Sequence, residues 1–194
     1  MSVLLTASLS AALPLSAASH VDVVKMRTEN RVNPLGIGTS TPRFSWQITS
    51  DRKGVVQTSY QILVASSREK LDRNEADLWD SGERNSDEQL WIPYQGKALL
   101  SGAQAYWKVR ITTNKGKSEW TEPQLFTIGL LGETKWSGTW IGLEDLQPGE
   151  QKGMHTRLAA RYIRKDFAAK GKVKRALAYV AGLGVYEFYV NGQR

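Results

Sequence analysis

Carboxylates are the side chains of this chain best suited to acid–base chemistry, and Asp80 and Glu83 form its most closely spaced candidate pair. They stand on either side of Ser81-Gly82, which is a turn signal. Two carboxyl groups on one turn could act as general acid and general base if a substrate lay between them. An Asp at such a turn most often hydrogen-bonds the local backbone instead. We therefore predict a structural role for this pair.

Asp166 and Glu187 are the second candidate pair, and both lie in strand-like runs. Adjacent strands could bring them together. Ion pairs with neighbouring cations are the stronger expectation, because opposite charges on neighbouring strands attract. The cations concerned are Arg164, Lys165 and Arg175.

Other familiar reactive patterns are missing from the sequence. The two histidines, His20 and His155, lie far apart, and there is no Cys, which excludes zinc–thiolate sites and disulfides. No nucleophile elbow supports Ser/His/Asp catalysis. The glycines at 36, 38, 182 and 184 lack the strand–GxGxxG–helix context of a phosphate cradle. We predict no catalytic residue, no metal and no cofactor.

Aromatic side chains offer a binding role, since the chain has seven Trp and seven Tyr against four Phe. Such rings stack on the apolar face of a sugar, and they also fill sandwich cores and domain interfaces. Trp136, Tyr186 and Tyr189 are the predicted sugar contacts. Trp91 and Tyr94 are weighed beside them, and for each ring core or interface packing is the stronger expectation.

A net charge of +7 raises the question of an anionic partner. The basic residues are scattered, apart from a cluster at 170–175 between two strand-like runs. A solvated hairpin loop explains this cluster better than a phosphate-binding patch, because no nucleic-acid motif accompanies it. Binding of nucleic acid or an anionic polymer is kept only as a third hypothesis.

The first twenty residues resemble a secretory signal. An apolar stretch from Val3 to Leu15 precedes the small residues 16–19. No Lys or Arg stands before Lys25, so the basic start of a signal is missing, and a buried first helix is the alternative. The stretch is too short for a confident membrane span. We predict a signal peptide at 1–20, a periplasmic or secreted bacterial protein, and no membrane contact once the signal is removed.

Short strand signals recur from Val21 to Ile128, separated by turn residues. Three of these strands alternate clearly, and the predicted inward faces are Phe44, Trp46 and Ile48; Val56, Tyr60, Ile62 and Val64; and Trp107, Val109 and Ile111. A short helix is predicted at Arg68 to Ala76, capped at Ser66-Ser67. Leu90 to Tyr94, broken by Pro93, suits an edge strand. This pattern predicts an all-β, Ig-like sandwich.

Two details resemble fibronectin type III domains. Leu100 stands six residues before Tyr106, as in a tyrosine corner, where the Tyr hydroxyl bonds upstream backbone. The stretch around Trp120 resembles the approach to the last strand, with its ring beside charged side chains. Both are folding devices and indicate no ligand.

The sequence divides into a complete first domain and part of a second. We predict a fibronectin type III-like sandwich at 21–129, a linker at 130–138 and a second β unit at 139–194. Strand-like runs in that unit cover Ala160 to Phe167, Val173 to Val180 and Val185 to Val190. The last run is followed by Asn191-Gly192, a strong hairpin signal, with no room for a return strand.

Several stretches together resemble bacterial α-L-rhamnosidases, a glycoside hydrolase family with an (α/α)6 catalytic barrel. Those similar to its N-terminal fibronectin-like domain lie at Val32 to Ser50, Gln57 to Ser67, Asp77 to Gly82 and Tyr106 to Leu131. Those similar to the start of the next domain, a jelly-roll β-sandwich, lie at Trp140 to Gly142, Ala160 to Phe167 and Arg175 to Arg194.

The resemblance implies a chain truncated within its second, jelly-roll-type sandwich. The two catalytic carboxyl groups of an inverting glycosidase would then lie in the barrel, outside this chain. The chain alone should be inactive, and it should pack within the enzyme against the barrel. The carbohydrate partner would be a rhamnose-containing glycan, bound by the full-length enzyme. A free-standing β-sandwich module for carbohydrate binding or adhesion is the alternative.

Overall fold

The computed structural model describes residues 21–132, 136–142, 146, 148–151, 153 and 159–194. The predicted signal peptide at 1–20, His20 and His155 lie outside the described residues. The chain divides into two units, Met1–Thr134 and Lys135–Arg194.

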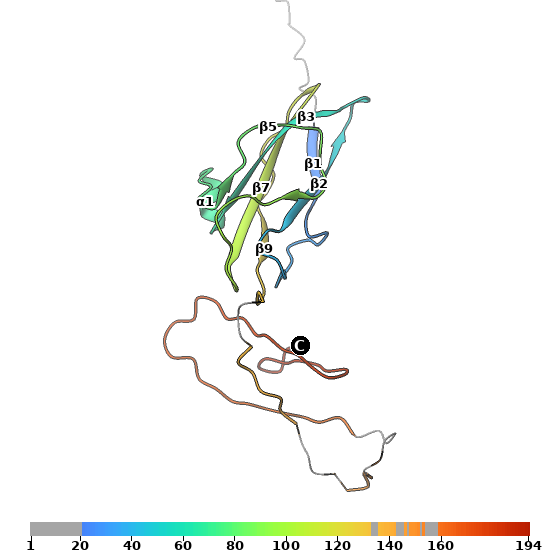
Figure 1. Ribbon diagram of the computed structural model, residues 1–194, viewed down its shortest axis with the longest axis vertical. Coiled ribbons are helices and arrows are strands. Elements are labelled where there is room, and N and C mark those ends of the chain that lie inside the picture. Colours follow the sequence, from blue (N-terminus) through green and yellow to red (C-terminus); the bar gives the residue numbers. More distant parts are fainter. Residues whose placement is uncertain (1–20, 133–135, 143–145, 147, 152, 154–158) are drawn as a thin grey trace, which may run out of the picture. The chain divides into compact units, whose positions relative to one another are not determined.

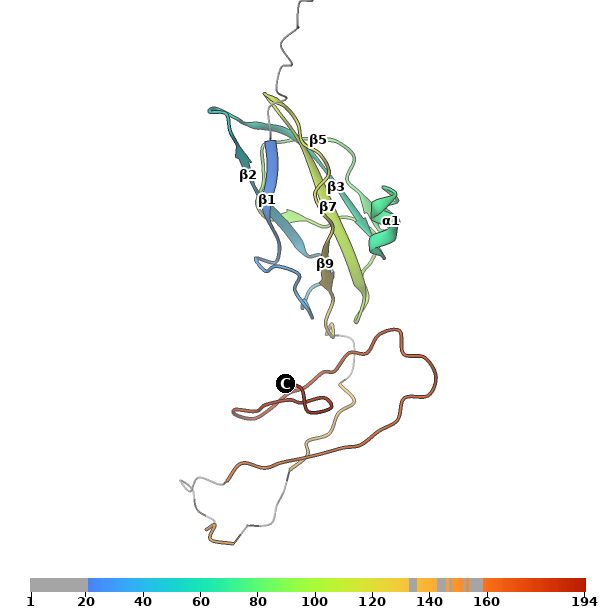
Figure 2. The ribbon, with the colours of Figure 1, turned by 180° about the vertical axis from the view of Figure 1, so that it is seen from behind.

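The first unit is a sandwich of two antiparallel sheets (Figures 1 and 2). The smaller sheet has the order β1-β2-β6, formed by Val21–Thr28, Arg43–Ser50 and Ile92–Pro93. In the larger sheet β4-β3-β7-β8 are neighbours, and β5 and β9 also pair with β3 and β7. Its strands are β3 (Gln57–Ala65), β4 (Trp79–Asp80), β5 (Arg84–Asn85), β7 (Gln104–Thr113), β8 (Gly116–Lys117) and β9 (Gln124–Thr127). The predicted Ig-like sandwich is confirmed.

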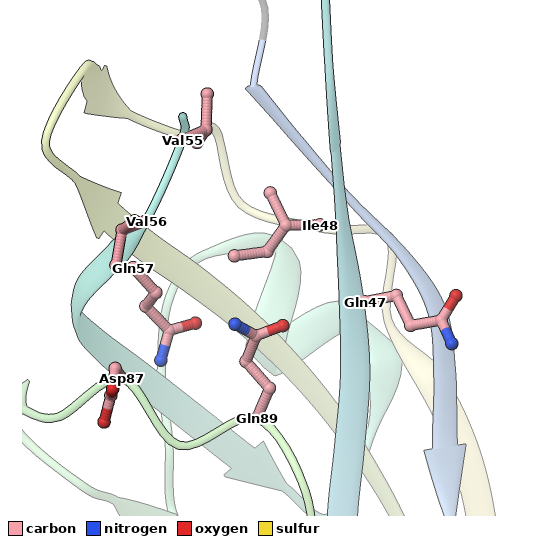
Figure 3. A pocket seen from close by; sticks show the side chains of 7 residues that line it. All are labelled: Gln47, Ile48, Val55, Val56, Gln57, Asp87 and Gln89. Atoms are coloured by element: carbon pink, nitrogen blue, oxygen red, sulfur yellow. The ribbon is translucent and has the colours of Figure 1, made fainter. Parts of the chain in front are cut away.

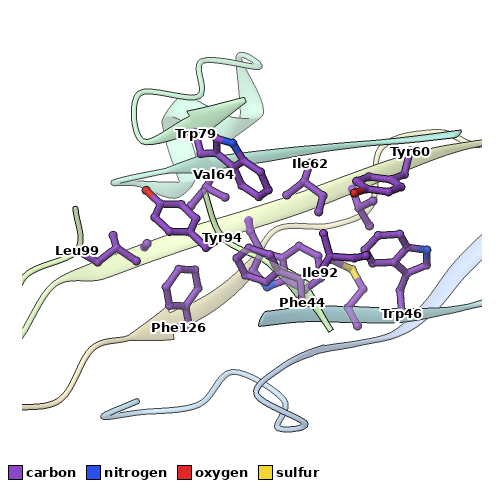
Figure 4. Packing of buried hydrophobic residues seen from close by; sticks show 14 of the residues in the cluster. Phe44, Trp46, Tyr60, Ile62, Val64, Trp79, Ile92, Tyr94, Leu99 and Phe126 are labelled. Carbon is purple, nitrogen blue, oxygen red and sulfur yellow. The ribbon is translucent and has the colours of Figure 1, made fainter. Parts of the chain in front are cut away.

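An aromatic core fills the space between the two sheets (Figure 4). Phe44 of β2 stacks on Trp107 of β7 with ring centroids 4.4 Å apart, and it contacts Phe126 of β9 edge-on. Trp46 meets Tyr60 of β3 in the same way. Since β2 belongs to the smaller sheet and the other strands to the larger one, these contacts join the two layers.

On β2 and β7 the inward side chains alternate as predicted. On β3 the prediction holds from Tyr60 to Val64. Val56 is the exception, because its side chain is 53% exposed. The pairing of β3 with β7 shifts between Gln57 and Ser59, and this bulge reverses the alternation. The bulge places Gln57 inside, where its Oε1 accepts from Trp46 Nε1 at 3.0 Å and its Nε2 donates to the Ser86 and Glu88 carbonyls.

The predicted tyrosine corner is wrong. The Tyr106 hydroxyl accepts from the Gln104 side chain, and Leu100 is exposed. Tyr94 has the comparable role, since its hydroxyl donates to the Lys97 carbonyl at 2.7 Å. Burial, assisted by the charge of Asp77, raises the pKa of Tyr94 to about 12 and keeps the hydroxyl a donor. Gly96 permits this turn, because a Cβ there would lie 2.4 Å from the Leu78 carbonyl oxygen.

Helix α1, Arg68–Asp72, lies on the outer side of the larger sheet. Ser67 caps it as predicted, and it ends before Ala76 because Asn74 has a φ of 60°. Leu71 packs on Leu63 and Ala65 of β3. Lys108, which is buried on the outer side of β7, donates to the Leu71 carbonyl and to Asn74 Oδ1. A cation at a helix C-terminus is favourable, so this contact fixes the helix to the sheet.

The second unit lacks the three predicted strands within its described residues, and a second jelly-roll sandwich is not seen there. Strand-like alternation forms a strand only where another strand supplies hydrogen bonds. Large apolar side chains such as Tyr162, Phe167 and Val185 are exposed. The Asn-Gly turn does form: Asn191 and Gly192 have φ of 50° and 78°, and Val190 exchanges two backbone hydrogen bonds with Gln193.

The core position of Trp107 generates a stability prediction. Trp107→Ala should lower the free energy of unfolding by about 3–5 kcal/mol, because the ring is fully buried between the sheets. Val56→Ala is the control, and its exposed side chain should cost less than about 0.5 kcal/mol. Urea unfolding of the chain followed by tryptophan fluorescence measures both. Equal costs would contradict the assignment of faces.

Asp77 generates a prediction on the pH dependence of stability. Burial alone would raise its pKa, but hydrogen bonds from Lys70 and Ser66 outweigh burial and lower the pKa from 3.8 to about 2. A lowered carboxyl pKa stabilises the fold above the unfolded value and loses this effect as pH falls toward the folded value. Asp77→Asn should cost about 1–2 kcal/mol near pH 6, after allowance for solvent screening.

The cost of Asp77→Asn should shrink as pH falls from about 4 to 2. Glu75→Gln is the matched control, because Glu75 pairs with Arg73 on the exposed surface. That change should have no measurable effect on the unfolding midpoint. A cost of Asp77→Asn that is the same at pH 6 and pH 2.5 would contradict the prediction.

Candidate functional site

The three predicted sugar contacts all lie in the second unit and are about half exposed. Trp136, Tyr186 and Tyr189 expose 50%, 53% and 51% of their surface. Trp136 and Tyr186 lie against Gly138 and Gly182, where an added Cβ would meet the rings. The Tyr189 hydroxyl donates to Glu187 Oε2 at 2.7 Å, and this bond raises the pKa of Tyr189. The exposure of these three rings agrees with sugar binding, and that role stays a prediction.

The aromatic pair of the first unit separates into one core ring and one surface ring. Tyr94 is buried, as described above, and cannot stack on a ligand. Trp91 is 43% exposed and directly precedes β6 (Ile92–Pro93). Its backbone φ of 61° is rare for a bulky residue, because the left-handed region crowds Cβ. A strained residue of this kind is held in place by its surroundings.

Arg43 and Glu29 hold the surface ring of Trp91 in a defined setting. The Arg43 guanidinium lies 4.2 Å from the centroid of the indole. Arg43 donates from Nε to Glu29 Oε1 at 3.1 Å and from Nη2 to Glu29 Oε2 at 2.8 Å. These hydrogen bonds lower the pKa of Glu29, which therefore stays ionised. We call Trp91, Arg43 and Glu29 the Trp91 platform.

The Trp91 platform was only partly visible in the sequence. Trp91 itself stood out as an aromatic candidate, but nothing in the sequence linked it to Arg43. The two side chains come together because β6 pairs with β2, with Arg43 opposite Pro93. Pairing of segments this far apart follows from the fold and has no local signal.

The candidate acid pairs have structural partners. Asp80 Oδ1 accepts from the Gly82 amide at 2.8 Å, which is the local backbone bond predicted for it. Glu83 accepts from the hydroxyls of Ser59 and Thr112, and these bonds lower the pKa of Glu83. A general acid needs a raised pKa, whereas the surroundings of Glu83 lower its pKa and keep it ionised.

The acids of the second unit are also paired with cations. Asp166 forms the expected ion pair with Arg164. Glu187 pairs instead with Arg194, at 3.2 Å, as well as accepting from Tyr189. Within the described residues, no group of three His, Cys, Asp or Glu side chains could hold a metal ion.

Two charged side chains cover the ring of Trp120, as expected from the sequence. Lys108 Nζ lies 5.1 Å and the Arg110 guanidinium 4.5 Å from its centroid. The Arg110 Nη2 also donates to Gln61 on β3. With both cations over it, this ring belongs to the outer surface of the larger sheet and offers little face for a ligand.

A hollow at the open edge between the sheets carries no reactive group beyond one carboxylate (Figure 3). It is lined by Gln47, Ile48, Val55, Val56, Gln57, Asp87 and Gln89. The Gln57 amide points into it but is already hydrogen-bonded to Trp46 and to two backbone carbonyls. The hollow is therefore a consequence of how the core hydrogen bonds are arranged.

In the described part of the chain, no helix is long and apolar enough to cross a membrane.

Comparison with known proteins decides the family. Residues 23–132 match the model described as "Rha78A-like, N-terminal immunoglobulin domain". The chain belongs to this family. Residues 23–132 are thus an N-terminal Ig-like domain of the α-L-rhamnosidase type, and the resemblance inferred from the sequence is confirmed.

Curated relatives extend the similarity beyond the Ig-like domain. An α-L-rhamnosidase of Formosa agariphila is 35% identical over 191 residues, which cover 91% of this chain and 20% of the relative. An α-L-rhamnosidase of Streptomyces avermitilis is 39% identical over 124 residues, covering 63% of this chain and 12% of the relative. The chain therefore spans a fifth or less of the length of these relatives.

Solved structures show the same fold. The crystal structure of Streptomyces avermitilis α-L-rhamnosidase complexed with L-rhamnose has a TM-score of 0.59 at 36% identity, covering 63% of this chain and 12% of that one. The α-L-rhamnosidase from Dictyoglumus thermophilum also has a TM-score of 0.59, at 32% identity, covering 67% of this chain and 15% of that one.

Proposed function

We propose that this chain is the non-catalytic N-terminal part of an α-L-rhamnosidase. The complete polypeptide would hydrolyse terminal α-L-rhamnose from glycans or glycosides. One observation carries the proposal: the identity to the Formosa agariphila α-L-rhamnosidase runs across 91% of this chain, so it includes both units, while covering 20% of the relative. A second Formosa agariphila α-L-rhamnosidase has 35% identity over 92% of this chain.

The electrostatics of the described acids support a non-catalytic role. Hydrolysis of a glycosidic bond needs a carboxylic acid with a raised pKa beside a second carboxylate. Glu29, Asp77 and Glu83 all have lowered pKa values, each because hydrogen bonds or cations stabilise the ionised form. The rigid sandwich is suited to a structural or accessory task within a larger enzyme.

A chimera tests the proposal with a positive readout. In the Formosa agariphila relative, the aligned N-terminal segment is replaced by this chain, and release of nitrophenol from an aryl α-L-rhamnoside is measured. We expect the chimera to keep activity, and a variant lacking the segment to lose soluble, active enzyme. The chain alone should give no turnover, because its acids lack the catalytic arrangement.

The Trp107→Ala version of the chimera is the internal control. It should lose activity in parallel with soluble yield, because the core of the Ig-like unit is damaged. Turnover by the isolated chain that copurifies with it would overturn the non-catalytic role. A chimera that folds but is inactive would contradict the shared architecture.

A further inference from the structure

A two-residue projection carries Trp91 away from the edge of the smaller sheet. Before it, the Gln89 carbonyl accepts from the Trp46 amide at 3.0 Å, and after it Ile92 pairs with Phe44. Between these anchors Leu90 and Trp91 are exposed, by 64% and 43%. The Trp91 amide donates to Ser45 Oγ at 3.0 Å, so the projection is fixed to the sheet by its backbone.

Backbone conformation makes this projection costly. Trp91 adopts a φ of 61°, which a bulky residue rarely does. A large apolar ring held at the surface in a strained conformation gives no gain in core packing. Such strain is concentrated where a side chain must be presented in a particular direction, which motivates a search for a ligand.

The polar part of the Trp91 platform is neutral overall and holds both kinds of hydrogen-bonding group. Glu29 engages Nε and Nη2 of Arg43, and two of the five guanidinium N–H donors are used in these bonds. Three donors remain on the guanidinium, which lies over one face of the indole. The ionised Glu29 carboxylate offers about four acceptor sites. Three accept from the Arg43 backbone amide, Nε and Nη2, which leaves one on Oε2 for a hydroxyl hydrogen. Because the two charges cancel, the platform does not favour an anion such as a phosphate chain.

We propose that the Trp91 platform is a carbohydrate-binding site for a neutral deoxy sugar of the L-rhamnoside class. The apolar face of the sugar would lie on the exposed part of the indole, and its hydroxyls would accept from Arg43 and donate to Glu29. An amphipathic ligand of this kind matches a rigid aromatic surface flanked by a paired donor and acceptor. The choice of rhamnoside rests on the proposed function. The platform is separate from Trp136, Tyr186 and Tyr189.

The test is a titration of the ¹⁵N-labelled chain with methyl α-L-rhamnoside, followed through the indole N–H signals. A Trp91→Phe variant identifies the Trp91 signal among those of the seven tryptophans. We expect a saturable shift of that signal with a dissociation constant on the order of 1–10 mM, as befits so small a ligand. Trp91→Ala should weaken binding at least tenfold, as read from the remaining shifted amides.

Two further variants locate the site and guard against misfolding. Glu29→Gln keeps the side-chain shape and should weaken binding roughly threefold, since the guanidinium is no longer held over the ring. Trp140→Ala is the control, because Trp140 is an exposed tryptophan of the second unit that is not among the predicted sugar contacts, and it should leave binding within about twofold. Unchanged signals of core residues show that each variant is folded.

The proposal is overturned if the Trp91 signal does not shift, or if the shifts persist in folded Trp91→Ala. It is equally overturned if Trp140→Ala, and not Trp91→Ala, abolishes binding. Loss of self-association in Trp91→Ala, without any rhamnoside effect, would show a protein contact and also overturn it. None of these results touches the chimera experiment, so failure here is distinguishable from failure of the proposed function.

Discussion

The stacking of Phe44 on Trp107 is the contact on which the rest of the first unit depends. It joins β2 of the smaller sheet to β7 of the larger one, with 4.4 Å between ring centroids. Neither sheet can shield its apolar inward face alone, because a single sheet leaves that face in contact with water. Once the two aromatic faces meet, the positions of β3, β6 and β9 follow from pairing with these two strands.

Polar contacts around this core decide which side chains reach the surface. The bulge in β3 turns Gln57 inward, where it satisfies Trp46 and two backbone carbonyls. Lys108 holds the end of α1 against the outer side of the larger sheet. At the edge of the smaller sheet, Arg43 and Glu29 position Trp91. The surface that we propose for ligand binding is thus built on the first residue of β2 and on the residues that directly follow β1 and precede β6.

Strict alternation allowed much of the first unit to be predicted from its sequence. Trp107, Val109 and Ile111 lie on the inward face as expected, because β7 pairs regularly with β3 over these residues. Val56 does not lie on the inward face, because a bulge depends on the partner strand and leaves no local signal in the sequence. The sequence also pointed to Tyr106, where the structure has Tyr94, as the tyrosine whose hydroxyl bonds the backbone of a turn. That role depends on the 94–97 segment lying next to Leu78, which no local pattern shows.

The second unit shows the limit of local pattern more sharply. Its alternating runs carry the residues of strands, yet the described residues hold only the Val190–Gln193 bridge. The most direct test of the division between a packed first unit and an open second unit is hydrogen exchange of the chain, resolved by residue. Amides in the centres of β3 and β7 should exchange only through global unfolding. Amides at 160–190 should exchange almost as fast as those of an unstructured peptide. Protection at 160–190 equal to that of β7 would contradict the account.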